Sequence, residues 1–103
     1  MNAVIQDKID EMIGLCRRFR VARLELFGSA ASDTDFDPQK SDIDFLVEFQ
    51  PLSPEDHADC YLGLLLEMQD LYHRRIDLVE TRAIRNRYFL EGVNRNRVPL
   101  YAA

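Results

Sequence analysis

Aspartates gather in one stretch of the sequence, between Leu26 and Phe49. It reads LFGSAASDTDFDPQKSDIDFLVEF, and five of its twelve residues from position 33 to position 44 are aspartates. The last two, Asp42 and Asp44, open a segment that alternates apolar and polar residues, as strands do. Side chains two positions apart on a strand leave the same face, so these carboxylates repel each other unless a proton or a cation lies between them. Oxygen-only ligands favour a hard ion such as Mg²⁺, which usually binds carboxylates together with substrate phosphates.

A third acidic residue, Asp77, raises the same question. It lies within RRIDLVE, residues 74–80, where an apolar residue is expected if that strand face is covered. If this strand pairs beside the strand of Asp44, three carboxylates can hold two metal ions. Two ions would clamp the attacking and leaving oxygens of a phosphoryl or nucleotidyl transfer. Alternatively, Asp77 lies at an exposed edge or pairs with Arg74 or Arg75, and taken alone it favours neither interpretation.

Gly28 and Ser29 come directly after another predicted strand, residues 21–27. A glycine lets the backbone approach a phosphate closely, and Ser29 adds a hydroxyl and an N–H group. A short helix after Ser29 would direct its N-terminus at the phosphates. A Gly-Ser pair is common in turns, so its meaning here comes from its place between one strand and the strand of Asp42 and Asp44.

The same stretch has the acids of a calcium-binding EF-hand loop, but other positions disagree with that motif. Counting from Asp33, acids stand at positions 1, 3, 5 and 12. Position 6, which needs glycine for a sharp turn, is Pro38, and position 12 is Asp44 where a bidentate glutamate is usual. The flanking segments also have the pattern of strands. We therefore expect Asp33, Asp35 and Asp37 to lie in a solvated loop.

Hydrophobic periodicity predicts the elements that position these residues. Apolar residues recur at helical spacing over 4–19 and 53–72, and they alternate with polar residues over 21–27, 41–49 and 75–80. Ser53 and Pro54 predict the start of the second helix, and Thr81 is a candidate cap for a last helix that ends near Gly92. Pro99 restricts residues 97–103 to a short edge strand. This order predicts one α/β (α+β) domain over residues 1–103, with a short mixed sheet flanked by helices.

The composition argues against several classes of protein. The formal net charge of -5 disfavours broad binding to nucleic acid phosphates. No run of about 18 apolar residues is present, so we expect no membrane-spanning helix. The segment MNAVIQDKID has early acids and no apolar core, so we expect no signal peptide and a cytoplasmic location. Cys16 and Cys60 fit reduced, mostly buried thiols, because two cysteines and two histidines at this spacing are too few for a zinc site.

Two features of the predicted surface leave alternatives open. The arginines fall into three groups, within 17–23, 74–75 and 82–97. They form either solvated helix faces, which we favour, or a surface for an acidic partner or a nucleotide. Helix 53–72 carries more apolar residues than one buried stripe requires. We therefore expect part of it, or the arginine-rich helix after Thr81, to bind a second chain.

The segments FGSAASDTDFDPQKSDIDFLVEF and RRIDLVE together resemble the minimal nucleotidyltransferases, a branch of the DNA polymerase β nucleotidyltransferase superfamily. Their signature is a strand ending in Gly-Ser, a loop, Asp-x-Asp on the next strand and a third aspartate on a later strand. By this resemblance, Gly28 and Ser29 would hold the triphosphate of ATP. Asp42, Asp44 and Asp77 would be the catalytic and metal-binding residues for two Mg²⁺ ions, and Asp77 would help to activate the acceptor hydroxyl.

Members of this size resemble the antitoxins of two-gene toxin–antitoxin pairs, whose partner is a HEPN-domain ribonuclease. The resemblance implies a Mg²⁺-dependent adenylyltransferase that silences the toxin by moving AMP from ATP to one of its tyrosines. The sequence departs from the family in a longer loop between Ser29 and Asp42, and in Ala30 and Ala31, since an arginine often follows Gly-Ser. The alternative is a weakly active or inactive antitoxin that neutralises its toxin by binding. An RNA or antibiotic nucleotidyltransferase is disfavoured, because we expect no second domain to hold such an acceptor.

Overall fold

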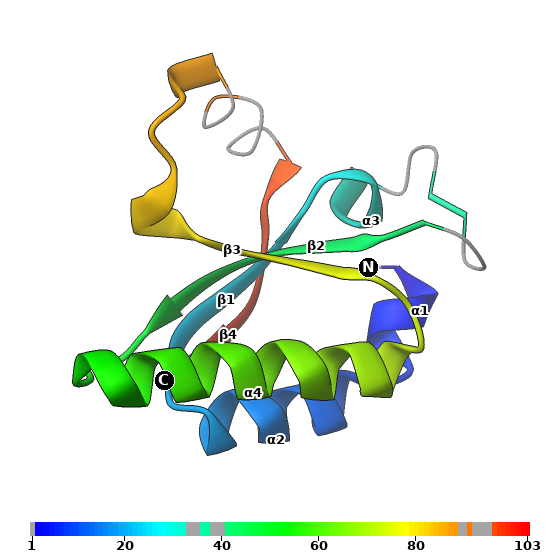
Figure 1. The fold of residues 1–103 in the computed structure, drawn as a ribbon. Coiled ribbons are helices and arrows are strands. Elements are labelled where there is room, and N and C mark those ends of the chain that lie inside the picture. The colour runs from blue at the N-terminus through cyan, green and yellow to red at the C-terminus, as the bar shows by residue number, and fades with distance from the viewer. Residues whose placement is uncertain (1, 33–35, 38–40, 89–90, 92–95) are drawn as a thin grey trace.

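The alternating segments form four strands of one mixed sheet (Figure 1). The computed structural model describes residues 2–32, 36–37, 41–88, 91 and 96–103. The strands are β1 (Val21–Phe27), β2 (Ile43–Phe49), β3 (Ile76–Glu80) and β4 (Val98–Ala102). They lie in the order β3-β2-β1-β4; β2 is parallel to β3, and β1 is antiparallel to both β2 and β4. The predicted α+β fold is confirmed, and Pro99 lies in an edge strand as expected.

Two longer helices, α2 (Ile9–Arg18) and α4 (Pro54–Tyr72), cover one face of this sheet. They lie side by side beneath the strands in Figure 1. Three short segments are α1 (Ala3–Gln6), α3 (Ser29–Ser32) and the 3₁₀ turn η1 (Thr81–Ala83). The start of α4 is as predicted, because the Ser53 hydroxyl accepts a hydrogen bond from the Asp56 N–H at 3.2 Å and Pro54 occupies the first turn.

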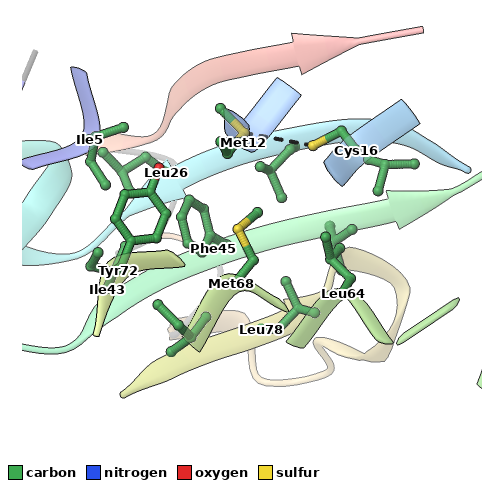
Figure 2. Close-up of a cluster of buried hydrophobic side chains, with 14 of the residues drawn as sticks. Ile5, Met12, Cys16, Leu26, Ile43, Phe45, Leu64, Met68, Tyr72 and Leu78 are labelled. Carbon is green, nitrogen blue, oxygen red and sulfur yellow. Dashed lines mark hydrogen bonds between the residues drawn. The ribbon is translucent and has the colours of Figure 1, made fainter. Parts of the chain in front are cut away.

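The hydrophobic core lies between these helices and the sheet (Figure 2). Ile43 and Phe45 of β2 are fully buried there, together with Met12 of α2 and Met68 of α4. Successive side chains on a strand point to opposite faces. Burial of Ile43 and Phe45 against the helices therefore directs Asp44, which lies between them, to the opposite face of the sheet. We call it the open face, because α2 and α4 do not cover it.

The predicted continuous helix over 4–19 is wrong, because the chain breaks between α1 and α2. The Asn2 side chain accepts a hydrogen bond from the Val4 N–H at 2.8 Å and starts α1. The Lys8 N–H then donates to the carbonyl of Ile5, three residues back, at 3.2 Å. This 3₁₀-type bond tightens the last turn of α1 and ends it. Ile5 is fully buried in this arrangement and lies near Leu26 in Figure 2.

The helix predicted from Thr81 to about Gly92 is also wrong at its start. Thr81 begins η1, and the chain is extended again at Ile84, with φ -76° and ψ 114°. The extended backbone lets Ile84 pack against Phe27 and Leu46 on the open face of the sheet. The helical turn therefore ends where Ile84, which is partly buried, meets these two side chains. Residues 89–90 and 92–95, where the prediction continues, lie outside the described residues.

The open face also holds a buried ion pair. Glu25 of β1 is only 6% exposed. It accepts hydrogen bonds from Arg97, at 2.5 Å from Nε and 2.7 Å from Nη2, and from Arg23 at 3.3 Å. The Arg97 guanidinium holds the pKa of Glu25 below its usual value. This pair ties the segment before β4 to the centre of the sheet.

Both cysteines are free thiols, as predicted; Cys16 is buried and Cys60 is partly buried. Burial raises the pKa of Cys16 to about 12, so its reactive thiolate form is suppressed at neutral pH. Cys16 therefore contributes to packing beside Met12, whose sulfur lies 3.7 Å from its Sγ. Within the described ranges, no helix is both long enough and apolar enough to cross a membrane.

Candidate active site

Asp44 and Asp77 lie at the same level on neighbouring strands. In the parallel ladder between β2 and β3, Asp44 is the partner of Asp77. In both strands the residues on either side of the aspartate are buried, and the aspartate itself is partly exposed. The two carboxylates consequently share the open face of the sheet. This juxtaposition is the one predicted if the third strand pairs beside the second.

The pKa of Asp44 shows that its surroundings disfavour the charged form of this carboxyl group. It is raised from 3.8 to about 7, first by burial and then by the neighbouring Asp77 and Asp42. A buried carboxylate beside two others retains its proton because the charged form is poorly solvated and repelled. The site therefore favours a proton or a cation at this position near neutral pH.

Arg75 supplies a positive charge to the other two carboxylates. Its Nε lies 3.9 Å from Oδ2 of Asp42 and 4.0 Å from Oδ1 of Asp77. Asp42 lies just before β2, with 44% of its side chain exposed, and the side chain of Asp77 is 46% exposed. The pairing of Asp77 with Arg75, which the sequence left open, is thus present in the structure. Arg75 bridges Asp42 and Asp77, whereas Asp44 faces Asp77 directly.

Gly28 lies against the carboxylate of Asp44. Its φ of +70° is in the left-handed region that favours glycine. A Cβ built on Gly28 would lie 2.3 Å from Oδ2 of Asp44. The glycine is therefore required both by its backbone conformation and by the space that Asp44 fills. Phe27, the residue before it, pairs with Asp44 in the ladder between β1 and β2.

A helical turn begins directly after Gly28, as expected. The Gly28 carbonyl accepts hydrogen bonds from the N–H groups of Ala31 at 3.1 Å and Ser32 at 3.3 Å. Ser29 is partly buried at the first position of α3. The turn places Ser29 next to the glycine that contacts Asp44, so Gly28 and Ser29 lie at the edge of the carboxylate site.

The loop between Ser32 and Asp42 is described only in part. Asp33 and Asp35, predicted to be solvated, lie outside the described residues. Asp37 is exposed, in agreement with that prediction. Its N–H donates to the Ser41 hydroxyl at 2.8 Å, and the Ser41 N–H donates to the Asp37 carbonyl at 2.9 Å. This reciprocal pair fixes the chain immediately before Asp42.

A groove of about 560 Å³ adjoins the carboxylates. Its lining includes Asp44, Asp77 and Arg75 together with Tyr61, Leu65 and Gln69 of α4. The Tyr61 hydroxyl donates to the Leu78 carbonyl at 2.5 Å, which fixes α4 against β3. A second cavity, of about 450 Å³, is lined by residues such as Pro51, Glu80 and Arg82 and contains none of the three aspartates. We assign the first groove to the candidate site because it contains the perturbed carboxylate.

The donor chemistry of the site fits Mg²⁺, although the side chains are not grouped as a complete metal cage. In the part of the chain that the structure describes, no three His, Cys, Asp or Glu side chains are placed to hold an ion together. Mg²⁺, however, is commonly bound through one or two carboxylates and the phosphates of its substrate. Asp44 and Asp77 provide two such hard oxygen ligands, placed on one level of neighbouring strands.

The chain also matches a known family. Residues 13–99 match the family model of the nucleotidyltransferase domain. This chain belongs to that family. No protein among the curated ones compared with it matches significantly.

Solved structures show that this nucleotidyltransferase is of the minimal type. One chain, described provisionally as a minimal nucleotidyltransferase, is 29% identical with a TM-score of 0.67, and the match covers 97% of each chain. A toxin–antitoxin structure with AMP-PNP is 21% identical with a TM-score of 0.67, covering 92% of this chain and 73% of that one. A complex of a tri-AMPylated Shewanella oneidensis HEPN toxin with its MNT antitoxin is 20% identical with a TM-score of 0.64, covering 95% and 72%. The last two matches, at about one fifth sequence identity, establish a shared fold only.

Arg75 is the residue at the candidate site whose position the sequence patterns do not predict in full. The sequence suggests Arg75 as an ion-pair partner of Asp77 and as a member of an arginine group, but it does not show that Arg75 also reaches Asp42. The signal was present, because Arg75 and Asp77 are two positions apart, like Asp42 and Asp44. With Ile43 opposite Ile76, one further step back along the two chains sets Asp42 beside Arg75. The exact register was needed to see this, and spacing within one segment does not provide it.

Proposed function

We propose that this nucleotidyltransferase is a Mg²⁺-dependent antitoxin that transfers AMP from ATP to a tyrosine of a HEPN-domain toxin. The observation that carries the proposal is the pair of Asp44 and Asp77 on one level of the sheet, with Gly28 against Asp44. The solved structures with AMP-PNP and with a tri-AMPylated HEPN toxin support it, because they contain the same fold.

The proposed reaction needs an acceptor hydroxyl, a nucleotide and a general base that accepts the proton of the hydroxyl. The hydroxyl oxygen attacks the α-phosphorus of ATP, the bond from that phosphorus to the β-phosphate oxygen breaks, and pyrophosphate leaves. Asp42, Asp44 and Asp77 would hold Mg²⁺, which would neutralise charge on the phosphate oxygens. Asp77 is half-exposed to the groove and would accept the proton of the acceptor hydroxyl as general base.

Gly28 and Ser29 would hold the triphosphate in this proposal. The absence of a side chain at Gly28 permits close approach of a phosphate to the backbone. Ser29 offers a hydroxyl and an N–H group at the start of α3. Pyrophosphate held at this edge would be the leaving group, which orients the α-phosphate toward the carboxylates.

The outer surface of α4 supports a protein partner. Leu62 and Leu66, one helical turn apart, have 56% and 63% of their surface exposed. Exposed acids Asp59 and Asp70 lie on the same stripe of the helix, on either side of the two leucines. An apolar patch with an acidic rim suits a partner surface of aliphatic residues flanked by lysine or arginine. We assign the toxin contact to this patch of Asp59, Leu62, Leu66 and Asp70.

A second candidate function is neutralisation of the toxin by contact alone. The observation that favours it is that three metal-ligating side chains are not grouped among the described residues. Both functions use the α4 patch, but only the first requires Asp44 and Asp77. The two functions are therefore separated by variants of these aspartates.

Co-expression with a HEPN-domain toxin, to be sought among the products of neighbouring genes, tests the proposal. Mass spectrometry of the toxin should find AMP on a tyrosine with the wild-type chain, and none with Asp44→Asn or Asp77→Asn. Asp10→Asn, at an exposed acid on α2, is the matched control and should retain the modification. A toxin that is neutralised equally by all four chains without carrying AMP would reject the transferase and support the contact mechanism.

A further inference from the structure

Arg75 occupies the space between two carboxylates of the proposed metal site. Its carbonyl accepts a hydrogen bond from the Ile43 N–H at 3.2 Å, which fixes its backbone beside the start of β2. Its Nε then lies 3.9 Å from Asp42 and 4.0 Å from Asp77. The side chain is 75% exposed, so no packing in the core holds the guanidinium in place.

A guanidinium at this position competes permanently with divalent ions for the two carboxylates. Arginine stays charged at every pH at which proteins fold, so Arg75 cannot leave by losing its proton. Exposed ion pairs of this length are weak, however, and are readily exchanged for better partners. The triphosphate of a nucleotide is such a partner, because phosphate oxygens bind guanidinium groups strongly.

We propose that Arg75 is a built-in counter-cation for Asp42 and Asp77, which weakens the binding of free divalent ions and makes their tight binding depend on the nucleotide. In the nucleotide-free chain, Arg75 balances part of the negative charge of the carboxylates. When a nucleotide enters the groove, its phosphates attract Arg75 and add oxygen ligands for the ion. Metal and nucleotide consequently bind cooperatively. This inference depends on the proposed metal-dependent function, but its test measures ion binding and not transfer.

Binding of Mn²⁺, used as a probe for Mg²⁺, can be measured by calorimetry on the full chain without nucleotide. Arg75→Ala should bind Mn²⁺ about three- to tenfold more tightly than wild type, because the competing cation is gone. Arg75→Lys should resemble wild type, since it keeps a charge beside the same carboxylates. Arg82→Ala is the matched control, because it removes the same charge from an exposed arginine of η1 that lines the other cavity.

The second measurement repeats the titration with a non-hydrolysable ATP analogue present. The proposal expects the analogue to tighten Mn²⁺ binding in wild type and to do so less in Arg75→Ala. If Arg75→Ala binds Mn²⁺ no more tightly than wild type while its thermal melt shows it folded, the counter-cation role is rejected and the proposed transfer is unaffected. If no variant binds Mn²⁺ with or without the analogue, the metal site itself is rejected, and the inference fails with it. Arg75→Gln gives a second neutral side chain should the alanine variant not fold.

Discussion

Asp44 of β2 and Asp77 of β3 are direct partners in a parallel ladder, so two acidic side chains share one level of the open face. The strand pairing enforces this closeness, and it is unfavourable for the isolated chain because like charges repel. A fold keeps such an arrangement at a cost in stability, which is common at functional sites. The physical consequences can be measured without any partner protein.

Asp44 should make the metal-free chain less stable as the pH rises from about 4 to 7. Its pKa is about 7 in the folded chain and close to 3.8 when unfolded. The folded state therefore binds the extra proton in this window, and its advantage is lost as the pH passes the folded-state value. In Asp44→Asn this loss disappears. Urea unfolding of both chains in EDTA at pH 5 and pH 8 measures the difference, and a difference that does not change with pH would contradict the assignment.

Gly28→Ala should destabilise the fold by about 2–4 kcal/mol, from a left-handed backbone and from the new Cβ against Oδ2 of Asp44. In an Asp44→Ala background the same change should cost only about 1–2 kcal/mol, because the clash is removed and the backbone term remains. Denaturant unfolding of the four chains gives the coupling energy. Equal costs in the two backgrounds would show that Gly28 does not contact Asp44.

The buried ion pair of Glu25 and Arg97 should stabilise the fold, whereas the paired carboxylates of Asp44 and Asp77 repel each other. Arg97→Met should cost about 2–3 kcal/mol, because a buried carboxylate loses its main partner. The partial exposure of Arg97 brings this figure below the range for fully buried pairs. Glu25→Gln should cost less, because its amide can still accept a hydrogen bond. The pKa of Glu25 is lowered in the fold, so the stability that it contributes is lost at acid pH and the effect of Arg97→Met should shrink there. Urea unfolding at pH 7 and at pH 3 checks both points.

Helix α4 should bind a partner through the patch of Asp59, Leu62, Leu66 and Asp70. The double substitution Leu62→Ser and Leu66→Ser should leave the free energy of unfolding nearly unchanged, since both side chains are exposed. It should weaken binding to the proposed HEPN-domain toxin by about tenfold or more. Calorimetric titration measures the affinity. Tyr88→Ser, at another exposed apolar residue, tests the arginine-rich segment as the alternative interface, and loss of binding there alone would move the contact away from α4.

The sequence predicts the site well where the information is local. Alternation within SDIDFLVEF is enough to turn Asp44 away from the buried Ile43 and Phe45, and the capping residues Ser53 and Pro54 mark the start of α4. Both signals depend on neighbours in the chain. These predictions agree with the structure for that reason.

Other features depend on contacts between distant segments, and there the sequence patterns are insufficient. Glu25 and Arg97 pair across 72 positions, which no periodicity reveals. η1 ends at Ala83 and Ile84 packs on the open face, although the pattern after Thr81 suits a helix. The bridge of Arg75 to Asp42 follows from the register of β2 and β3, which is set only when the sheet forms.

The central claim is nucleotidyl transfer at the carboxylates beside Gly28, and the position of a labelled phosphate tests it most directly. The chain, Mg²⁺ and the HEPN-type partner should be incubated in parallel with ATP labelled on the α-phosphate and with ATP labelled on the γ-phosphate. We expect label on the partner from the α-phosphate only, with release of pyrophosphate, and no label from either with Asp77→Asn. Transfer of the γ-label would instead show a kinase-like reaction and would contradict both the role of Gly28 and Ser29 and the account of the site.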